Sequence, residues 1–422
     1  MFNKNKKAIN YFLLILIIVV LIFLPQIFSS LFALTLLSKM GVLIIFTVAY
    51  NMLLGQIGLL SFGHAVYFGL AGYISIHLLN AINSDLLIPI PLIIFPIIGA
   101  ISGLIIGIVI GYLSTRRIGT SFAMISLGFC EMITAMTMIF VVFFNGEDGI
   151  QANRVIENNL LGINYGPPSN VYYLILFWSI LCVSIMFFLT KTPFGRICNA
   201  IRDNAQRAEF IGYNVRKVRW LAFSLSAMFA GAAGSLHAIN YEHIGFESVS
   251  LIQSGAVLFM AFIGGIGHFL GPIIGAILLT FLDSTLADIT EAWLLYLGLL
   301  FILVVTFAPG GLAGIVVMHG PIMRNKPKLF INLITPYLFA LVSSLILFIG
   351  STGIIELFYA YFFNHTEDIV IYWLSFTNLN IYPWVIFIFI SLIGYYLCKK
   401  SYLIVRNEWH YVMDKVKNEI NI

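Results

Sequence analysis

Charged residues are scarce in this sequence. Asp, Glu, Lys and Arg make up 9% of the 422 residues, whereas 60% are hydrophobic and the mean hydropathy is +1.00. Soluble globular chains are typically about one quarter charged, so this composition excludes a soluble fold. The net charge of +4 is spread over loops, with no basic soluble domain, which excludes a nucleic-acid-binding protein.

Reactive and metal-binding motifs are also missing. The four cysteines, Cys130, Cys182, Cys198 and Cys398, are far apart and form no C-x-x-C pair, so we expect neither a disulfide framework nor a zinc site. The sequence has no phosphate-binding loop of the form G-x-x-x-x-G-K-[ST], no H-E-x-x-H motif and no G-x-S-x-G motif. We therefore expect no catalytic residues, no cofactor and no metal.

Long apolar runs dominate the sequence instead. A span needs about 20 apolar residues, and runs of this length can cross lipid only as helices. We predict an all-α, polytopic integral membrane protein, with about ten transmembrane helices up to residue 324 and about two beyond it. The predicted spans lie near residues 8–29, 41–57, 62–80, 86–113, 122–144, 171–190, 219–241, 251–266, 270–287, 292–317, 329–350 and 381–398.

Basic residues set the predicted topology. Lys4, Lys6 and Lys7 place the N-terminus in the cytoplasm, and an even number of spans then places the C-terminus there too. The other basic residues that this topology puts in the cytoplasm lie in 116–117, 191–219, 324–328 and 399–417. Only Lys39 and Arg154 depart from the pattern.

The spans suggest two domains. Residues 1–324 are predicted to form one helical transmembrane domain whose polar breaks are short, except at 145–170 and 191–218. Residues 325–422 are predicted to form a C-terminal extension with a basic linker, about two spans and a charged cytoplasmic tail.

Glycines recur every four residues in two places, which puts them on one face of a helix and lets a neighbouring backbone approach closely. The two sets are Gly99, Gly103, Gly107 and Gly111, and Gly267, Gly271 and Gly275. We interpret both sets as packing faces, with pore lining as the alternative.

The segment 51–72 is polar and interrupted by glycines where a continuous span is expected. Such a break is tolerated at membrane depth only if it is buried in protein or lines a cavity, so the segment is either a tight turn, a translocation pathway or both. Its pathway candidates are Asn51, Gly55, Gln56, Ser61 and His64. His64 could also be purely structural.

Glu131 lies within the predicted span 122–144. A carboxylate inside a membrane span is a candidate functional residue by default, so Glu131 joins the pathway candidates. The alternative is an interhelical hydrogen bond.

The segment 191–218 is polar and basic, so it must lie outside hydrocarbon. We predict a helix over 196–211 that ends at Gly212, with Asn214 beyond it. One face of this helix would be apolar, formed by Ile197, Ala200, Ile201, Ala208 and Ile211. The helix is either interfacial or a rigid lever that transmits force from a cytosolic motor.

Six segments in order resemble the ABC-transporter permeases of the high-affinity branched-chain amino acid type, the LivM-like subunits. They are 51–73, 119–131, 145–149, 195–215, 254–275 and 307–314, so the resemblance covers about 50–315. Two positions depart from the pattern: Glu147 stands where glycine is usual, and Arg207 replaces a small residue.

The resemblance implies a non-catalytic transport subunit in a bacterial inner membrane. It would pair with a second homologous permease, two ABC ATPase subunits that hydrolyse ATP, and a periplasmic substrate-binding protein. The substrate would be a branched-chain or other small amino acid, passing near residues 55–64 at the interface of the two permeases. Residues 203–212 would be the coupling helix, and the coupling residues would be Arg202, Asp203, Ala208, Glu209 and Gly212.

Three alternatives remain open from the sequence. Related permeases for urea or short amides share much of the pattern. An ion-coupled secondary carrier would instead relay protons through Glu131 and His64. A structural or assembly subunit would act through the extension at 325–422.

Overall fold

The computed structural model describes residues 2–156, 162–325, 327–364, 368–372, 374–377 and 380–420. It describes only the backbone at 2–14, 321, 324–325, 327–328, 363–364, 368–370, 377 and 417–420. Lys326 and the side chains of Lys4, Lys6 and Lys7, which carry part of the predicted topology, lie outside this description. The chain divides into two compact units, Met1–Thr285 with Phe301–Gly314, and Leu286–Leu300 with Ile315–Ile422. The domain boundary predicted after residue 324 stays a prediction.

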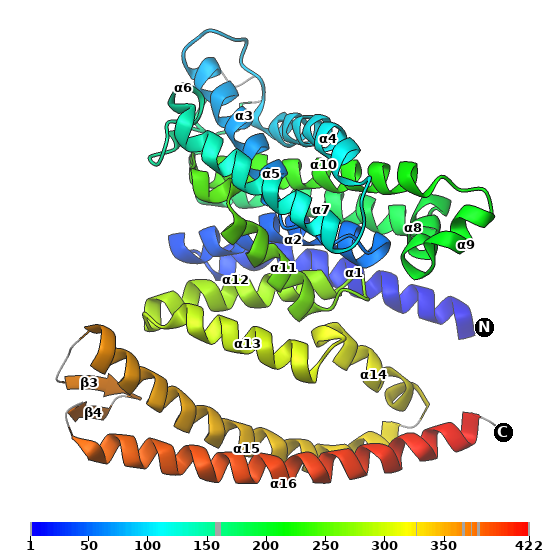
Figure 1. The fold of residues 1–422 in the computed structure, drawn as a ribbon, viewed down its shortest axis with the longest axis vertical. Coiled ribbons are helices and arrows are strands. Elements are labelled where there is room, and N and C mark those ends of the chain that lie inside the picture. The colour runs from blue at the N-terminus through cyan, green and yellow to red at the C-terminus, as the bar shows by residue number, and fades with distance from the viewer. Residues whose placement is uncertain are drawn as a thin grey trace. The chain divides into compact units, whose positions relative to one another are not determined.

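Helices form nearly all of the described chain, which confirms the predicted all-α class (Figure 1). The longer helices are α1 (Phe2–Ile27), α2 (Leu31–Ile57), α3 (Ala65–Asn83), α4 (Phe95–Ser114), α5 (Thr120–Ile139), α7 (Pro168–Lys191), α10 (Val215–Tyr241), α11 (Leu251–Gly264), α12 (Gly271–Ile289), α13 (Trp293–Phe307), α14 (Gly311–Asn325), α15 (Pro327–Tyr359) and α16 (Ile381–Ile420). The shorter helical elements are η1 (Leu92–Ile94), α6 (Val141–Phe144), α8 (Pro193–Asp203), α9 (Ala205–Phe210), η2 (Phe246–Val249) and η3 (Ala360–Asn364). Two antiparallel strand pairs join β1 (Ile150–Gln151) to β2 (His243–Ile244) and β3 (Asp368–Ile371) to β4 (Leu374–Thr377).

Within the described residues, ten helices are long and apolar enough to cross a membrane. The chain is therefore a multi-pass membrane protein. Ten of the twelve predicted spans correspond to these helices, and Leu251–Gly264 is a shorter apolar helix. The predicted span at 8–29 lies in α1, and the side chains of α1 are described only for Ile15–Ile27. Helix α11 ends at Gly264 because Gly265 follows with φ of 110°, a conformation outside the helical region. A Cβ atom at Gly264 would overlap the carbonyl oxygen of Gly271, so glycine is needed for this close approach.

The core of the first unit lies around α10, which packs against α2, α3 and α4. The glycines of α4 face α10: a Cβ atom at Gly103 would overlap the carbonyl oxygen of Ala227, and one at Gly231 would overlap that of Gly99. The other two α4 glycines also face α10, Gly107 against the side chain of Ala227 and Gly111 against that of Phe223, so for this set the packing interpretation is confirmed and the pore-lining alternative is wrong. In the second set, Gly271 and Gly275 also contact neighbouring backbone, whereas Gly267 faces open space.

The two basic residues that depart from the predicted topology each have partners. Lys39 on α2 forms an ion pair with Asp283 on α12, with 2.8 Å between Nζ and Oδ2. Arg154 donates to three backbone carbonyls, those of Tyr165, Gly166 and Asn240, at 2.8 to 3.0 Å. The side-chain partners of Lys39 and Arg154 therefore explain why these basic residues lie where the positive-inside rule does not expect them.

Removing Lys39 should destabilise the protein by leaving a carboxylate unpaired within a membrane span. Both side chains keep about a third of their surface exposed, so we expect a loss of about 2 kcal/mol for Lys39→Ala, below the range for a fully buried pair. The double variant with Asp283→Ala should lose less than the two single variants summed. A double-mutant cycle on thermal unfolding in detergent measures this coupling, and additive effects would contradict it.

The second unit is built on the antiparallel hairpin of α15 and α16 (Figure 1). Glycines bring the two backbones together, because a Cβ atom at Gly350 would overlap the amide nitrogen of Ser391. Glu356 on α15 accepts hydrogen bonds from Thr290 and Tyr296, at 2.8 and 2.7 Å. These contacts explain why Leu286–Leu300 belongs to this unit.

Candidate functional site

The break predicted at 51–72 is a turn that folds back against α2. Helix α2 ends at Ile57, and Gly58 adopts a left-handed conformation with φ of 75°. The Tyr50 hydroxyl, about two turns earlier in α2, donates to the Ser61 carbonyl at 3.1 Å, and α3 starts at Ala65. The turn prediction is confirmed, and the pathway prediction stays a prediction.

Two serines from other helices hold this turn. Ser126 on α5 accepts a hydrogen bond from the Phe62 amide at 3.0 Å, and Ser254 on α11 accepts one from the Ala65 amide at 3.0 Å. Both lie within segments that carry the family resemblance, but nothing in the sequence distinguishes them from other serines in spans. They were missed because their role depends on the packing of distant helices.

His64 lies in the protein core with no exposed surface. Its Nε2 is 3.3 Å from the Ser226 hydroxyl, which itself donates to the Ala49 carbonyl at 2.5 Å. Because the Ser226 hydrogen is used, Nε2 must carry the proton and donate. The ring of His64 also stacks on Phe46, at 5.6 Å between centroids. These contacts favour the structural interpretation of His64.

The other pathway candidates differ in exposure. Asn51, Gly55 and Ser61 are buried and Gln56 is half-buried, whereas Glu131 is exposed on α5. The Oδ1 atom of Asn51 has no hydrogen-bond partner within the described chain. Glu131 likewise makes no hydrogen bond or ion pair with the residues that the structure describes, so the predicted interhelical hydrogen bond is absent from this part of the chain.

The segment 191–218 forms two short helices, so the prediction of one helix over 196–211 is wrong. Asn204 interrupts it in an extended conformation with φ of −158°, and its side chain accepts the Arg207 amide at 2.9 Å as the cap of α9. The predicted stop is confirmed, since Gly212 has a φ of 99°. Asn214 then caps α10 by accepting the Lys217 amide at 3.0 Å.

The two short helices bury only part of the predicted apolar face. Ile201 and Ala208 are buried, as predicted, but Ile211 is 70% exposed. The neighbouring Phe210 is 90% exposed, and sequence analysis did not single it out. On α8, Ala200 is exposed and Ile197 is half-buried, so the predicted face is only partly buried on either side of the break at Asn204. The tip of α9 therefore presents two apolar side chains to the surroundings.

Arg202 joins the predicted coupling segment to the end of α2. Its Nη1 donates to the Gly55 carbonyl in the last turn of α2, and its Nε and Nη2 donate to Asp203 Oδ1 at 3.1 and 3.0 Å. The C-terminal carbonyls of a helix are unpaired and carry partial negative charge, so a guanidinium is a favourable partner. A Cβ atom at Gly58 would lie only 3.1 Å from Arg202 Cγ, so glycine also makes room for the side chain.

The predicted site residues thus form separate groups. Arg202 contacts Gly55 and Asp203, whereas Glu209 and Gly212 are exposed at the end of α9 and Ala208 is buried. Ser61 and His64 lie together at the turn, and Glu131 is exposed on α5. Among the described residues, no group of three or more His, Cys, Asp or Glu side chains could hold a metal ion.

The reactivity of the Cys198 thiol on α8 can be used to measure whether this segment is packed against the rest of the protein. Burial raises the pKa of this thiol from the usual 9.0 to about 12. Because the thiolate is the reacting form, alkylation at pH 9 should be about five hundredfold slower in the folded protein than after denaturation. Peptide mapping after N-ethylmaleimide treatment measures both rates, and equal rates would show that α8 is not packed as described.

These features describe a multi-pass membrane protein in which two short polar helices contact the C-terminal end of a span. Residues 32–305 match the family described as branched-chain amino acid transport system, permease component. The chain therefore belongs to this family of ABC transport permeases, which are non-catalytic subunits.

Relatives agree with this assignment. The chain is 27% identical over 290 residues to the high-affinity branched-chain amino acid transport system permease protein LivM of Escherichia coli (strain K12), covering 64% of this chain and 67% of the relative. LivM of Salmonella typhimurium matches with the same identity and coverage. The autoinducer 2 import system permease protein LsrC of Yersinia enterocolitica is 34% identical over 112 residues, 25% of this chain and 31% of the relative. No solved structure matches the chain.

Proposed function

We propose that this chain is a permease subunit of an ATP-driven ABC importer for branched-chain or other small amino acids. It works in a bacterial inner membrane with both termini in the cytoplasm. Its partners are a second homologous permease, two ABC ATPase subunits and a periplasmic substrate-binding protein. The family and the LivM relatives support the transporter class, and the name of those relatives supports the substrate.

The contact of Arg202 with the Gly55 carbonyl carries this proposal. Arg202 was predicted as a coupling residue and Gly55 as a pathway residue, from different parts of the sequence. Their contact gives a movement of α8 and α9 a direct route to the broken end of α2. Coupling in ABC importers requires such a route, because ATP is hydrolysed on a separate subunit and only conformation reaches the pathway.

The exposed tip of α9 is the surface that the ATPase would cover. Phe210 and Ile211 are apolar and exposed in an otherwise polar segment, next to the exposed Glu209. Apolar side chains surrounded by polar ones are typical of a protein interface. We assign the predicted coupling residues Glu209 and Gly212 to this docking surface.

The exposed face of α5 supports translocation at a permease interface. Ser121, Gly128 and Glu131 share this face, and all three are exposed. A carboxylate within a membrane span almost always faces other protein or a water-filled cavity rather than lipid. A second permease placed against α5 would give Glu131 such an environment.

Purification of the tagged chain from native membranes in mild detergent tests the assembly. Mass spectrometry should identify an ATPase with a phosphate-binding loop and a second permease in the eluate. A variant with Phe210→Ser and Ile211→Ser should lose the ATPase and keep the second permease. A chain that purifies alone and transports in liposomes on an ion gradient would overturn the proposal in favour of a secondary carrier that uses Glu131.

Substrate competition tests the amino acid assignment. Uptake of radiolabelled leucine by cells that express the complete transporter should be inhibited by unlabelled isoleucine and valine, and not by urea or acetamide. Inhibition by urea or acetamide alone would move the transporter to the short-amide class while leaving its ABC mechanism in place.

A further inference from the structure

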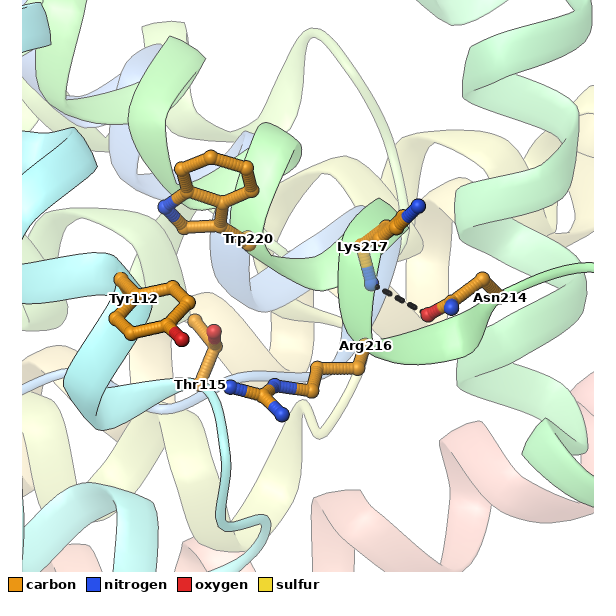
Figure 2. Close-up of a pocket in the computed structure, with 6 residues that line it drawn as sticks. All are labelled: Tyr112, Thr115, Asn214, Arg216, Lys217 and Trp220. Carbon is orange, nitrogen blue, oxygen red and sulfur yellow. Dashed lines mark hydrogen bonds between the residues drawn. The ribbon is translucent and has the colours of Figure 1, made fainter.

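A cavity of about 230 Å³ lies between the C-terminal end of α4 and the N-terminal end of α10. Six residues line it: Tyr112 and Thr115 from the α4 end, and Asn214, Arg216, Lys217 and Trp220 from the α10 end. Figure 2 shows the guanidinium of Arg216 and the hydroxyl of Tyr112 directed toward the same space, with Trp220 above them. The cavity is separate from the turn and from the tip of α9.

The charge around this cavity is positive and unbalanced. The guanidinium of Arg216 lies 5.3 Å from the centre of the Tyr112 ring, and that of Arg116 lies 4.6 Å from the same centre. Lys217 adds a third cation, and none of the six lining residues is acidic. Arg116, Arg216 and Lys217 form no ion pair with any residue that the structure describes. An anion would therefore complete the site.

Most of the other polar groups already have partners. The indole of Trp220 donates to the Ile108 carbonyl at 2.9 Å, and the Thr115 hydroxyl donates to the Gly111 carbonyl at 2.6 Å. The donors that remain for a ligand are the Arg216 guanidinium and the Lys217 ammonium, together with the Tyr112 hydroxyl. A guanidinium can donate two parallel hydrogen bonds to a phosphate, which makes Arg216 the principal residue of the site.

The surroundings indicate what carries the phosphate. The cavity lies at the ends of two membrane spans, Leu92–Ser114 and Val215–Tyr241. Leu113 and Leu221, which follow the lining residues Tyr112 and Trp220 in the sequence, are 49% and 48% exposed, so these span ends offer apolar surface to an acyl chain. Tyr and Trp at span ends, with basic residues beside them, are typical of the interface with lipid headgroups.

We propose that the cavity binds the headgroup phosphate of an anionic phospholipid, in the leaflet on the same side as α8 and α9. Arg216 contacts the phosphate, Lys217 and Arg116 add attraction, and the acyl chains lie along Leu113 and Leu221. An acidic surface of a protein partner is less suited, because a soluble surface would leave these apolar residues in water. The proposal does not depend on the transported substrate.

Lipid retention by the intact protein tests the site. The protein is placed in phosphatidylcholine nanodiscs with increasing phosphatidylglycerol, and bound lipid is counted by native mass spectrometry. Arg216→Gln should weaken phosphatidylglycerol binding about fivefold, the effect of one basic residue at a membrane surface. Arg117→Gln is the matched control, because Arg117 is exposed in the same loop as Arg116 but does not line the cavity.

Each outcome of this experiment either supports or contradicts the proposed lipid site. A loss in Arg216→Gln, with Arg117→Gln unchanged and Arg216→Lys intermediate, supports it. Equal losses in both Gln variants would reveal a general surface charge effect, and displacement of lipid by inorganic phosphate would make free phosphate the ligand. Unchanged lipid binding in Arg216→Gln, with loss of a protein from the purified complex, would assign the cavity to a protein partner. Each of these last three results overturns the proposal.

Discussion

Replacing Arg202 by alanine should lower uptake about tenfold while ATP hydrolysis by the assembled transporter continues. The variant removes the hydrogen bond to the Gly55 carbonyl and leaves the docking tip of α9 unchanged. The ATPase would still bind and hydrolyse ATP, but the movement of α8 would no longer reach α2. Uptake and ATPase rates measured together in proteoliposomes give the ratio of transport to hydrolysis, which should fall.

The matched control for this prediction is Arg196→Ala. Arg196 is exposed on the same helix, and the change removes the same charge without touching α2. Arg202→Lys should recover part of the uptake, because an ammonium can donate to one carbonyl but cannot bond Asp203 and Gly55 in the same geometry. An unchanged transport ratio in Arg202→Ala, with the fold intact by thermal unfolding, would show that the contact does not transmit the conformational change.

Replacing Gly231 by leucine should prevent stable folding. The new side chain would overlap the backbone of α4 at the Gly99 carbonyl and approach the Cα atom of Gly103 within 2.9 Å. Two helix backbones would have to separate, so we expect a loss of at least about 3 kcal/mol, the upper end for overpacking. The measurement is the yield of monodisperse protein and its thermal midpoint in detergent.

Gly298→Leu provides the comparison for that result. Gly298 lies in α13, and a Cβ atom there would meet nothing within 4 Å. This variant should fold with nearly normal yield, which separates the effect of the contact from that of losing a helix glycine. Normal stability of Gly231→Leu would mean that α4 and α10 do not approach as closely as described.

Hydropathy predicted the helical class and most spans, because burial of apolar surface in lipid depends on local composition alone. The prediction of a span at 251–266 agrees with α11, which ends two residues earlier, at Gly264. Helix periodicity failed at 196–211, because the side chain of Asn204 caps a new helix and amphipathic patterns assume one continuous helix. Ala200, which precedes the cap, is exposed as well.

The candidate site was only partly predictable. The break at 51–72 was evident from its glycines and polar residues, since these residues are costly in a continuous span. Ser126 and Ser254 could not be found, because each acts by accepting a hydrogen bond from the backbone amide of a residue far away in the sequence. The same holds for Lys39 and Asp283, which are 244 positions apart. Long-range pairing depends on how helices pack, and a single sequence does not contain that information.

The partner of Arg202 is a main-chain carbonyl, and every amino acid carries one. A substitution at position 55 can block the contact by its bulk, since a Cβ atom there would already come within 2.7 Å of the Ile266 carbonyl oxygen. It cannot change the chemical nature of the hydrogen-bond acceptor, which is the main-chain carbonyl. Contacts between side chains leave paired substitutions across relatives, which reveal them in alignments. This contact would leave only two separate invariant positions, an arginine and a glycine, so comparisons that look for correlated changes would overlook the connection between them.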